Sequence, residues 1–280
     1  VRYTGAVPVF IDAEDDHWQM DTRVLADYIS EHYRVEGDQV FNRTTGRRLG
    51  AIMPVHILGH PVDMEALMAL AWKYDIPVLE DATESLGATV YGSPVGTSGD
   101  ISVFSFNGNN LLTAGGGGAL IARDPEHARH ARYLSTQAKD DPAEYVHHQI
   151  GYNYRLTNIQ AAIACAQLEQ LDEFLKVKKD IAARYDHAFQ GHSGIHPLKQ
   201  ASWARSSNWL YSVRVVESAY GLSSRQLIAR LSKNGIQSRP LWQPMHQSLA
   251  MKGSPHSACP VSRKIHAEAI SIPCSIGLTQ

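Results

Sequence analysis

The chain has 280 residues, of which 44% are hydrophobic, and its formal net charge at pH 7 is −2. This length allows a substantial core in one large or two smaller domains, and the near-neutral charge excludes the basic surface that binds nucleic acids or anionic membranes. No apolar run approaches the roughly 20 residues of a transmembrane helix, and three widely spaced cysteines favour the reducing cytoplasm without indicating a metal site.

The first 135 residues alternate short apolar runs with helical patterns, which predicts an α/β chain with a mainly parallel sheet flanked by helices. Asp21 begins a helical pattern, and Asp63 stands where a helix N-cap is expected. The polar residues 36–48 indicate a surface excursion. The expected strands are 6–11, 51–58, 76–79, 101–106 and 117–122, and the expected helices begin after Asp21, after Asp63 and at Pro125.

A long helical pattern begins after Thr157 and continues to Phe189. It is longer than most globular helices, which suits a helix that links a large domain to a small one, and we place the boundary near Ala182. The resulting segments are a large domain of residues 1–182 and a smaller α+β domain of residues 183–280, with a strand at 209–216, a helix at 223–234 and loops from 238 onward.

Polar side chains follow two apolar strands in the stretch 79–118. Asp81 and Glu84 come after the first strand, and Ser105 ends the second, before an asparagine-rich turn that includes Asn110 and a run of four glycines. In open α/β sheets, ligands bind at the carboxyl ends of the strands. The sequence therefore predicts that Asp81, Ser105 and Asn110 converge at one edge of a sheet, in a ligand site.

Three motifs in this half of the chain carry a family resemblance: EDATESLG from Glu80, GDISVFSFNGNN ending at Asn110 with TAGGGG after it, and GYNYR from Gly151. Together they resemble the DegT/DnrJ/EryC1/StrS sugar aminotransferases, which use pyridoxal 5′-phosphate (PLP) on a fold of the aspartate-aminotransferase type, PLP fold type I. The wording around Asn110 is most similar to the branch that aminates UDP-linked 4-keto-6-deoxy sugars for bacillosamine and legionaminic acid.

The resemblance implies a role for each polar residue. Asp81 would contact the pyridine nitrogen of the cofactor, Glu84 its phenolic oxygen and Ser105 its phosphate. Asn153 would reach the phosphate bound to a neighbouring subunit, which implies a homodimer. Without the resemblance, Asp81 reads as an N-cap or loop carboxylate and Glu84 as a solvated glutamate in a first helical turn.

Two further stretches match the family. RPLWQPMH resembles its substrate-side loop and implies substrate contacts for Arg239, Trp242 and His246. His56, in PVHILG, matches a family histidine, but a hydrogen-bonded histidine at a strand end explains it equally well.

The Schiff-base lysine of the family falls at Asn110, where it is absent. An amide is not nucleophilic and does not titrate near pH 7, so Asn110 can neither capture the cofactor covalently nor transfer the proton. The nearest downstream lysine, Lys139, matches ordinary family sequence at its own position. The residues leave three origins of Asn110 open: an engineered replacement, a natural loss of activity, or an error in the sequence.

The resemblance implies a PLP-dependent aminotransferase that moves an amino group, with glutamate as donor, to a 4-keto-6-deoxy nucleotide sugar in the biosynthesis of cell-surface polysaccharides. Asn110 would leave PLP or pyridoxamine 5′-phosphate (PMP) bound noncovalently. The alternative is an inactive homologue or fragment that binds cofactor, nucleotide sugar or a partner without turnover. We also expect the chain to lack a family N-terminal portion, which carries the phosphate-binding loop, and a short C-terminal one.

Overall fold

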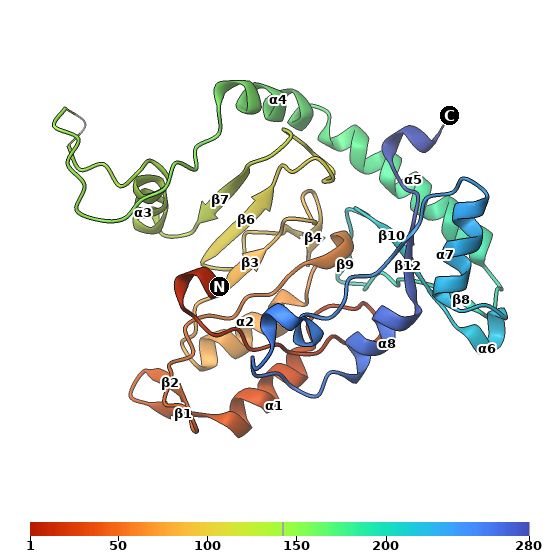
Figure 1. Ribbon diagram of the computed structural model, residues 1–280, viewed down its shortest axis with the longest axis horizontal. Coiled ribbons are helices and arrows are strands. Elements are labelled where there is room, and N and C mark those ends of the chain that lie inside the picture. Colours follow the sequence, from red (N-terminus) through yellow and green to blue (C-terminus); the bar gives the residue numbers. More distant parts are fainter. Residues whose placement is uncertain (142, 280) are drawn as a thin grey trace.

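The computed structural model describes residues 1–141 and 143–279. Figure 1 shows strands β3, β6 and β7 on one side of the molecule and β10 and β12 on the other, with α4 and α5 running between the two sides. The helices are α1 (Thr22–His32), α2 (Met64–Lys73), α3 (Pro125–Ser135), α4 (Asn158–Leu168), α5 (Leu171–Phe189), α6 (Glu217–Tyr220), α7 (Ser224–Lys233) and α8 (Pro260–Glu268). The strands are β1 (Tyr33–Glu36), β2 (Gln39–Asn42), β3 (Leu79–Asp81), β4 (Thr89–Val90), β5 (Ser93–Pro94), β6 (Ile101–Ser105), β7 (Gly118–Ala122), β8 (Ile195–Pro197), β9 (Ala204–Arg205), β10 (Tyr211–Val215), β11 (Arg239–Pro240) and β12 (Ala269–Ile272). Short 3₁₀ helices are η1 (Arg2–Thr4), η2 (Ile57–Gly59), η3 (Met245–Gln247), η4 (Leu249–Met251) and η5 (Ile276–Thr279).

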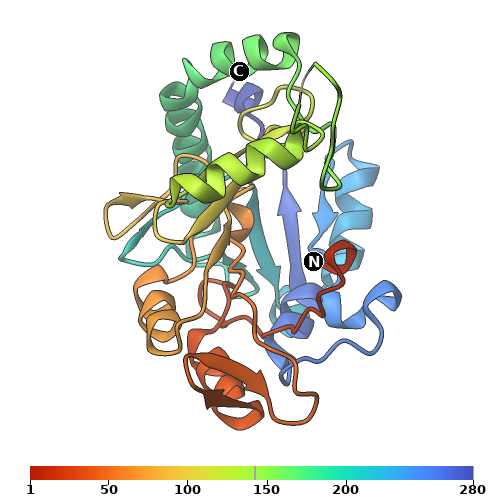
Figure 2. The same ribbon diagram turned by 90° about the vertical axis from the view of Figure 1, so that its left-hand side faces the viewer.

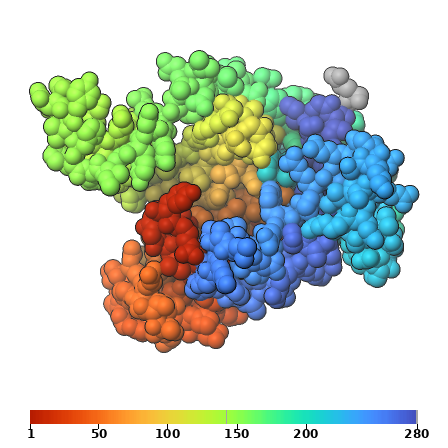
Figure 3. Space-filling view, viewed as in Figure 1, coloured from red at the N-terminus to blue at the C-terminus, as the bar shows by residue number. Residues whose placement is uncertain are grey.

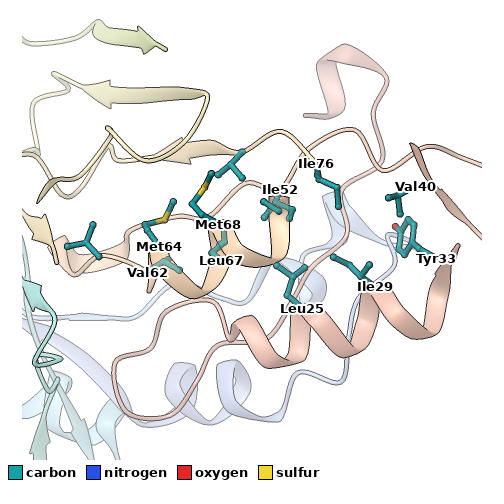
Figure 4. Packing of buried hydrophobic residues seen from close by; sticks show 13 residues of the cluster. Leu25, Ile29, Tyr33, Val40, Ile52, Val62, Met64, Leu67, Met68 and Ile76 are labelled. Carbon is teal, nitrogen blue, oxygen red and sulfur yellow. The ribbon is translucent and has the colours of Figure 1, made fainter. Parts of the chain in front are cut away.

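The first core lies between α1, α2 and the segments that enter the sheet. The predicted cap is confirmed, because Asp63 accepts a hydrogen bond from the backbone of Ala66 in α2. Asp21 also caps its helix and accepts hydrogen bonds from the first turn of α1. Figure 4 shows side chains of both helices facing one another across this core. Its labelled members are Leu25, Ile29, Tyr33, Val40, Ile52, Val62, Met64, Leu67, Met68 and Ile76.

The sheet that carries the site is built from parallel neighbours. β3 and β6 pair in parallel with Asp81 opposite Val103, and residues 52–55 add two parallel bridges on the other side of β3. β7 closes the sheet antiparallel to β6. The carboxyl ends of residues 52–55, β3 and β6 therefore meet at one edge.

Three expected strands of this half are absent, shortened or shifted relative to the prediction. Residues 6–11 form only an isolated parallel bridge between Phe10 and His256. Residues 51–58 pair only through Ile52 and Val55 before the chain turns into η2, and β3 begins at Leu79 rather than at residue 76. Prolines at positions 54 and 77 explain both shortened ladders, because proline has no N–H to donate. The excursion 36–48 also contains part of the β1–β2 hairpin.

The single long helix is wrong as well. Thr157 forms the predicted cap, in a capping box with Gln160, but α4 ends at Leu168 and α5 begins at Leu171. At the break, Gln170 has φ −104° and ψ 3°. The interruption lets α5 turn its apolar side chains into the core while no residue of α4 is buried.

The C-terminal region folds around an antiparallel sheet in the order β11, β12, β10, β8. Figure 2 shows α5 and α7 beside this sheet, and side chains of both helices join its strands in one core. The predicted helix after Ser223 is confirmed by a capping box with Gln226. The prediction of loops from residue 238 onward is wrong, because α8 and β12 lie there and β12 pairs with both β10 and β11.

One contact joins opposite ends of the chain. The carboxylate of Asp12, which is 2% exposed, accepts hydrogen bonds of 2.9 Å from the backbone N–H groups of Val261 and Ser262 in the first turn of α8. The N-cap residue of this helix, Cys259, offers no side-chain cap of its own. A small core nearby combines side chains from both halves, namely Trp18, Leu58, Leu241, Ile265 and Ala269. The division at residue 182 stays a prediction.

Apolar side chains are exposed along α4 and along the preceding segment, residues 136–141 and 143–154, which we call the arm. Figures 1 and 3 show the arm projecting from the body of the molecule beside α3. Ile159 of α4 is 74% exposed, and Ile150, Tyr152 and Tyr154 of the arm are also exposed. In the described part of the chain, no helix combines the length and the apolarity needed to cross a membrane.

Candidate active site

Four of the predicted site residues lie at the carboxyl edge of β3 and β6. Because Asp81 pairs with Val103, Ser105 lies two residues further along β6 at the same edge. Side chains alternate between the faces of a sheet, so Asp81 and Ser105 share one face. Glu80 lies on the opposite face, where its carboxylate meets the Ser102 hydroxyl at 3.4 Å.

Asp81 is a half-buried carboxylate on a firmly held backbone. Its N–H donates to the carbonyl of Pro54 (2.9 Å), and its carbonyl accepts from the N–H of His56 (3.0 Å). Its Oδ1 accepts a hydrogen bond from the N–H of Thr83 (3.2 Å), and among the described residues no donor reaches Oδ2. No helix follows Asp81, so it is a loop carboxylate with one free oxygen rather than an N-cap.

Asn110 is held against the end of β6 by its own side chain. Its amide Nδ2 donates to the carbonyl of Ser105 (3.0 Å), and its backbone N–H donates to the carbonyl of Asn107 (3.1 Å). The Ser105 hydroxyl in turn accepts from the N–H of Asn107 (3.2 Å). The turn 107–110 thus holds Asn110 at the end of β6, the strand that pairs with β3 and its terminal residue Asp81.

Glu84 lies in the loop after β3, where its Oε2 accepts a 2.7 Å hydrogen bond from the backbone N–H of Leu58. Burial raises the pKa of this carboxyl to about 7, and the charge of Asp81 adds to the effect, while the Leu58 hydrogen bond opposes it. The solvated first-turn glutamate considered from the sequence is wrong, because no helix begins here. Glu84 is therefore divided between its acid and its anion near neutral pH.

Glu84→Gln is expected to change how stability depends on pH. A folded-state pKa of about 7, raised from 4.5, means that the Glu84 contribution to stability is lost as pH rises from 4.5 through 7, by roughly 3 kcal/mol. Glutamine keeps the acceptor for Leu58 but does not titrate. Urea unfolding from pH 4.5 to 7.5 should show the variant gaining stability relative to the parent as pH rises.

The titration of His60 opposes that of Glu84, so the stability of the parent chain changes little with pH over this range. Burial lowers the pKa of His60 from 6.5 to about 4, so its contribution to stability is lost as pH falls over nearly the same range. The pH dependences of stability that come from Glu84 and from His60 oppose each other in the parent chain. In Glu84→Gln only the one from His60 should remain. Glu65→Gln, an exposed change in α2, is the matched control; unfolding curves for Glu84→Gln that stay parallel to the parent would contradict the assignment.

His56 is explained by burial and hydrogen bonding. Its Nδ1 accepts from the N–H of Val62 (3.0 Å), which leaves the proton on Nε2, 3.1 Å from a carboxylate oxygen of Glu80. Both side chains are fully buried. This arrangement matches the hydrogen-bonded strand-end histidine among the two readings of the sequence.

No sequence motif predicted two of the contacts near the site. The indole N–H of Trp209, at the start of the segment leading into β10, donates to the carbonyl of Asn109 at 2.8 Å. Gly59, with φ 90°, passes so close to residues 207–209 that a Cβ there would lie 2.7 Å from the backbone nitrogen of Trp209. The sequence shows only a tryptophan before a strand and a glycine in HILGH. Neither indicates which distant residue it contacts.

The remaining predicted residues lie apart from Asp81 within this chain. Asn153 is exposed on the arm, where it bridges Thr136. Trp242 stacks on Trp209 with ring centroids 6.1 Å apart. His246 packs 5.1 Å from the ring of His256, and burial lowers its pKa. Arg239 is exposed on β11. In the described residues, no hydrogen bond or ring contact joins Arg239 or His246 to the turn 107–110.

A polar cavity of about 230 Å³ lies nearby but does not include the predicted site. It is lined by α5 and residues 198–212, with Leu58 and His60 at one wall. None of Asp81, Glu84 or Asn110 contributes to it. Across residues 1–141 and 143–279, no cluster of three metal-ligating side chains is found.

The fold and the site together define the class. The structure is similar over the whole chain to the PMP form of the putative sugar aminotransferase Spr1654 from Streptococcus pneumoniae, with a TM-score of 0.85, 26% sequence identity and 72% of that chain covered. The α/β arrangement predicted from the sequence, of PLP fold type I, is confirmed by such neighbours. The chain has the fold of the PLP-dependent aminotransferases.

The family follows from the sequence match. The profile of the DegT/DnrJ/EryC1/StrS aminotransferase family matches residues 1–280, and the chain belongs to this family. The putative pyridoxal phosphate-dependent aminotransferase EpsN of Bacillus subtilis is 37% identical over 246 residues, and GDP-perosamine synthase of Escherichia coli O157:H7 is 34% identical over 275. These matches cover 88% and 98% of this chain but 60% and 69% of the relatives.

Proposed function

We propose that this chain forms the cofactor site of a PLP-dependent aminotransferase that moves an amino group from glutamate to a 4-keto-6-deoxy nucleotide sugar. The observation that supports this most is the placement of Asp81 at the carboxyl end of β3, with Ser105 and Asn110 at the end of the parallel neighbour β6. The names of the relatives, a PLP-dependent aminotransferase and a perosamine synthase, support the same class of reaction.

The residues present fit the ring of the cofactor but not its covalent attachment. The Oδ2 of Asp81 meets no donor among the described residues, so it is available to a protonated ring nitrogen. Asn110, by contrast, is an amide already bonded to the backbone. We therefore propose noncovalent binding of PLP or PMP at this site.

Each residue has a distinct part in the proposed reaction. When bound, PLP supplies an electron sink for the carbon that exchanges its amino group. With the cofactor bound, Asp81 would hold a proton on the ring nitrogen, Glu84 would contact the phenolic oxygen, and Ser105 would bind the phosphate. Asn110 provides no general base, so we expect the chain to transfer amino groups barely or not at all.

We further propose that the functional form is a homodimer in which Asn153 serves the neighbouring site. Asn153 lies on the arm, where it bridges Thr136. The exposed apolar residues of the arm and of α4 support an extensive interface of the obligate class. Arg239, Trp242 and His246 remain our proposed substrate contacts.

The second candidate function is binding without turnover. It is favoured by one observation, the hydrogen bond that engages the Asn110 amide with Ser105 rather than leaving it directed at a ligand. The two functions share the cofactor site, and the parent chain is expected to show little turnover under either one. Multiple-turnover assays of Asn110→Lys with glutamate and a 4-keto-6-deoxy nucleotide sugar separate them.

Asp81→Asn is expected to weaken PMP binding about 10- to 100-fold, because a hydrogen bond to a charged carboxylate is lost. Isothermal titration of PMP into the parent and the variant measures this. Asp63→Asn is the matched control, since asparagine also caps helices and α2 lies outside the site. Equal PMP affinity of the parent and Asp81→Asn would show that Asp81 is not the ring partner.

A further inference from the structure

Trp209 is a buried side chain on a backbone anchored from two other segments. Its indole is 4% exposed, and its carbonyl accepts a 2.7 Å hydrogen bond from Nζ of the buried Lys178 on α5. The same Nζ donates to the carbonyl of Cys274 (2.7 Å) near the end of the chain. The position of Trp209 is thus fixed by α5 and by the C-terminal segment.

The turn that carries Asn110 depends on Trp209 for its long-range contact. The other hydrogen bonds of residues 107–110 are local, such as that from Asn107 Nδ2 to Asn109 Oδ1 (2.8 Å). The bond from the Trp209 indole to the Asn109 carbonyl spans 100 positions and, in the described residues, is the one that ties this turn to a distant element.

A second contact of the indole is with the segment 239–246, which contains the proposed substrate contacts. Trp242 stacks on Trp209 with an angle of only 6° between the ring planes. Trp242 is 53% exposed and Trp209 is 4% exposed, so the pair joins a buried ring to one that is about half open to solvent. Trp209 therefore touches both the turn 107–110 and the segment 239–246.

We propose that Trp209 is a positioning residue that holds the turn of Asn110 in place and transmits the position of the loop around Trp242 to it. Its consequence for substrate depends on the proposed function, whereas the mechanical coupling does not. A buried indole N–H needs an acceptor in either role, so the test is whether the turn that supplies this acceptor depends on the bond. Phenylalanine separates the two roles, because it keeps an aromatic ring and removes the N–H.

Trp209→Phe is expected to speed hydrogen exchange of the turn about 2- to 10-fold, the effect of losing one hydrogen bond. Exchange measured by mass spectrometry on peptides covering residues 106–114 reports the amides of Asn110 and Ala114, which donate to Asn107 and Phe106. Peptides of the β10 ladder should be unchanged. Trp203→Phe is the matched control, because that indole stacks on Tyr91 (5.7 Å) and makes no hydrogen bond among the described residues.

Trp242→Ala tests the transmission. We expect it to speed exchange of residues 106–114 in the parent and to add nothing in the Trp209→Phe background. Unchanged exchange of the turn in Trp209→Phe would overturn the positioning role, and equal effects of Trp242→Ala in both backgrounds would overturn the transmission.

Cofactor titration then separates this proposal from the proposed function. We expect Trp209→Phe to weaken PMP binding by about the same factor as it speeds exchange, 2- to 10-fold. A faster-exchanging turn with unaltered PMP affinity would overturn the effect of Trp209 on the ligand while leaving the structural coupling standing. Failure of every variant and of the parent to bind PMP would instead refute the proposed function.

Discussion

Asn110→Lys is expected to give the chain covalent capture of PLP and to raise amino transfer about 10²- to 10⁴-fold, the usual contribution of a positioned general base. The amide at this position hydrogen-bonds to the Ser105 carbonyl at the carboxyl end of β6. A lysine there can reach over the same edge and adds both a nucleophile and a titratable group.

Two measurements check this expectation independently. Borohydride reduction followed by peptide mass analysis detects PLP fixed to the introduced amine, and turnover of a 4-keto-6-deoxy nucleotide sugar with glutamate reports catalysis. Asn109→Lys, one position away in the same turn, is the matched control. Rapid turnover by the parent chain would show that position 110 is not the catalytic one, and capture without turnover in Asn110→Lys would favour the binding function.

Glu80→Gln is expected to lower the free energy of unfolding by about 3 to 5 kcal/mol. The buried carboxylate accepts hydrogen bonds from the backbone N–H groups of Gly96 (2.9 Å), Ser98 (2.8 Å) and Gly99. His56 donates to it as well. A glutamine would turn an NH₂ group toward at least one of these donors, which leaves buried polar groups unpaired.

Urea unfolding at pH 7 measures the loss, with the exposed Glu36→Gln as control. Burial acts to raise the pKa of Glu80, but the hydrogen bonds from His56 and Gly99 outweigh it and hold the pKa below its usual value. The contribution of Glu80 is therefore present above the ordinary glutamate pKa and is lost as pH falls below it. A Glu80→Gln chain as stable as the Glu36→Gln chain would contradict this role.

The edge shared by Asp81 and Ser105 could be predicted from the sequence because strand ends are local information. Asp81 and Ser105 each follow an apolar run, and parallel pairing brings such ends together whatever the details of the ladder. The wrong limits of β3 and of residues 51–58 did not matter, since Asp81 still lies at the carboxyl end of β3 and pairs with β6.

What the sequence missed are contacts between distant residues. Nothing near Glu84 indicates that the N–H of Leu58 meets it, and nothing near Trp209 indicates a bond 100 positions away. The break before Leu171 and strand β12 were missed for a related reason, because both depend on packing against elements elsewhere in the chain. The two interpretations of His56 could not be separated from the sequence either, since only its hydrogen-bond partners distinguish them.

The bond between Asp12 and α8 sets an order of events during protein synthesis. Asp12 and Val261 are 249 positions apart, so at about 5 to 20 residues per second the carboxylate leaves the ribosome roughly 12 to 50 seconds before its partner. The entropy of closing so long a loop grows only logarithmically and does not forbid the contact. Helix α8 therefore gains this cap only after residue 262 has been made, and the Asp12 side chain of the nascent chain stays hydrated until then.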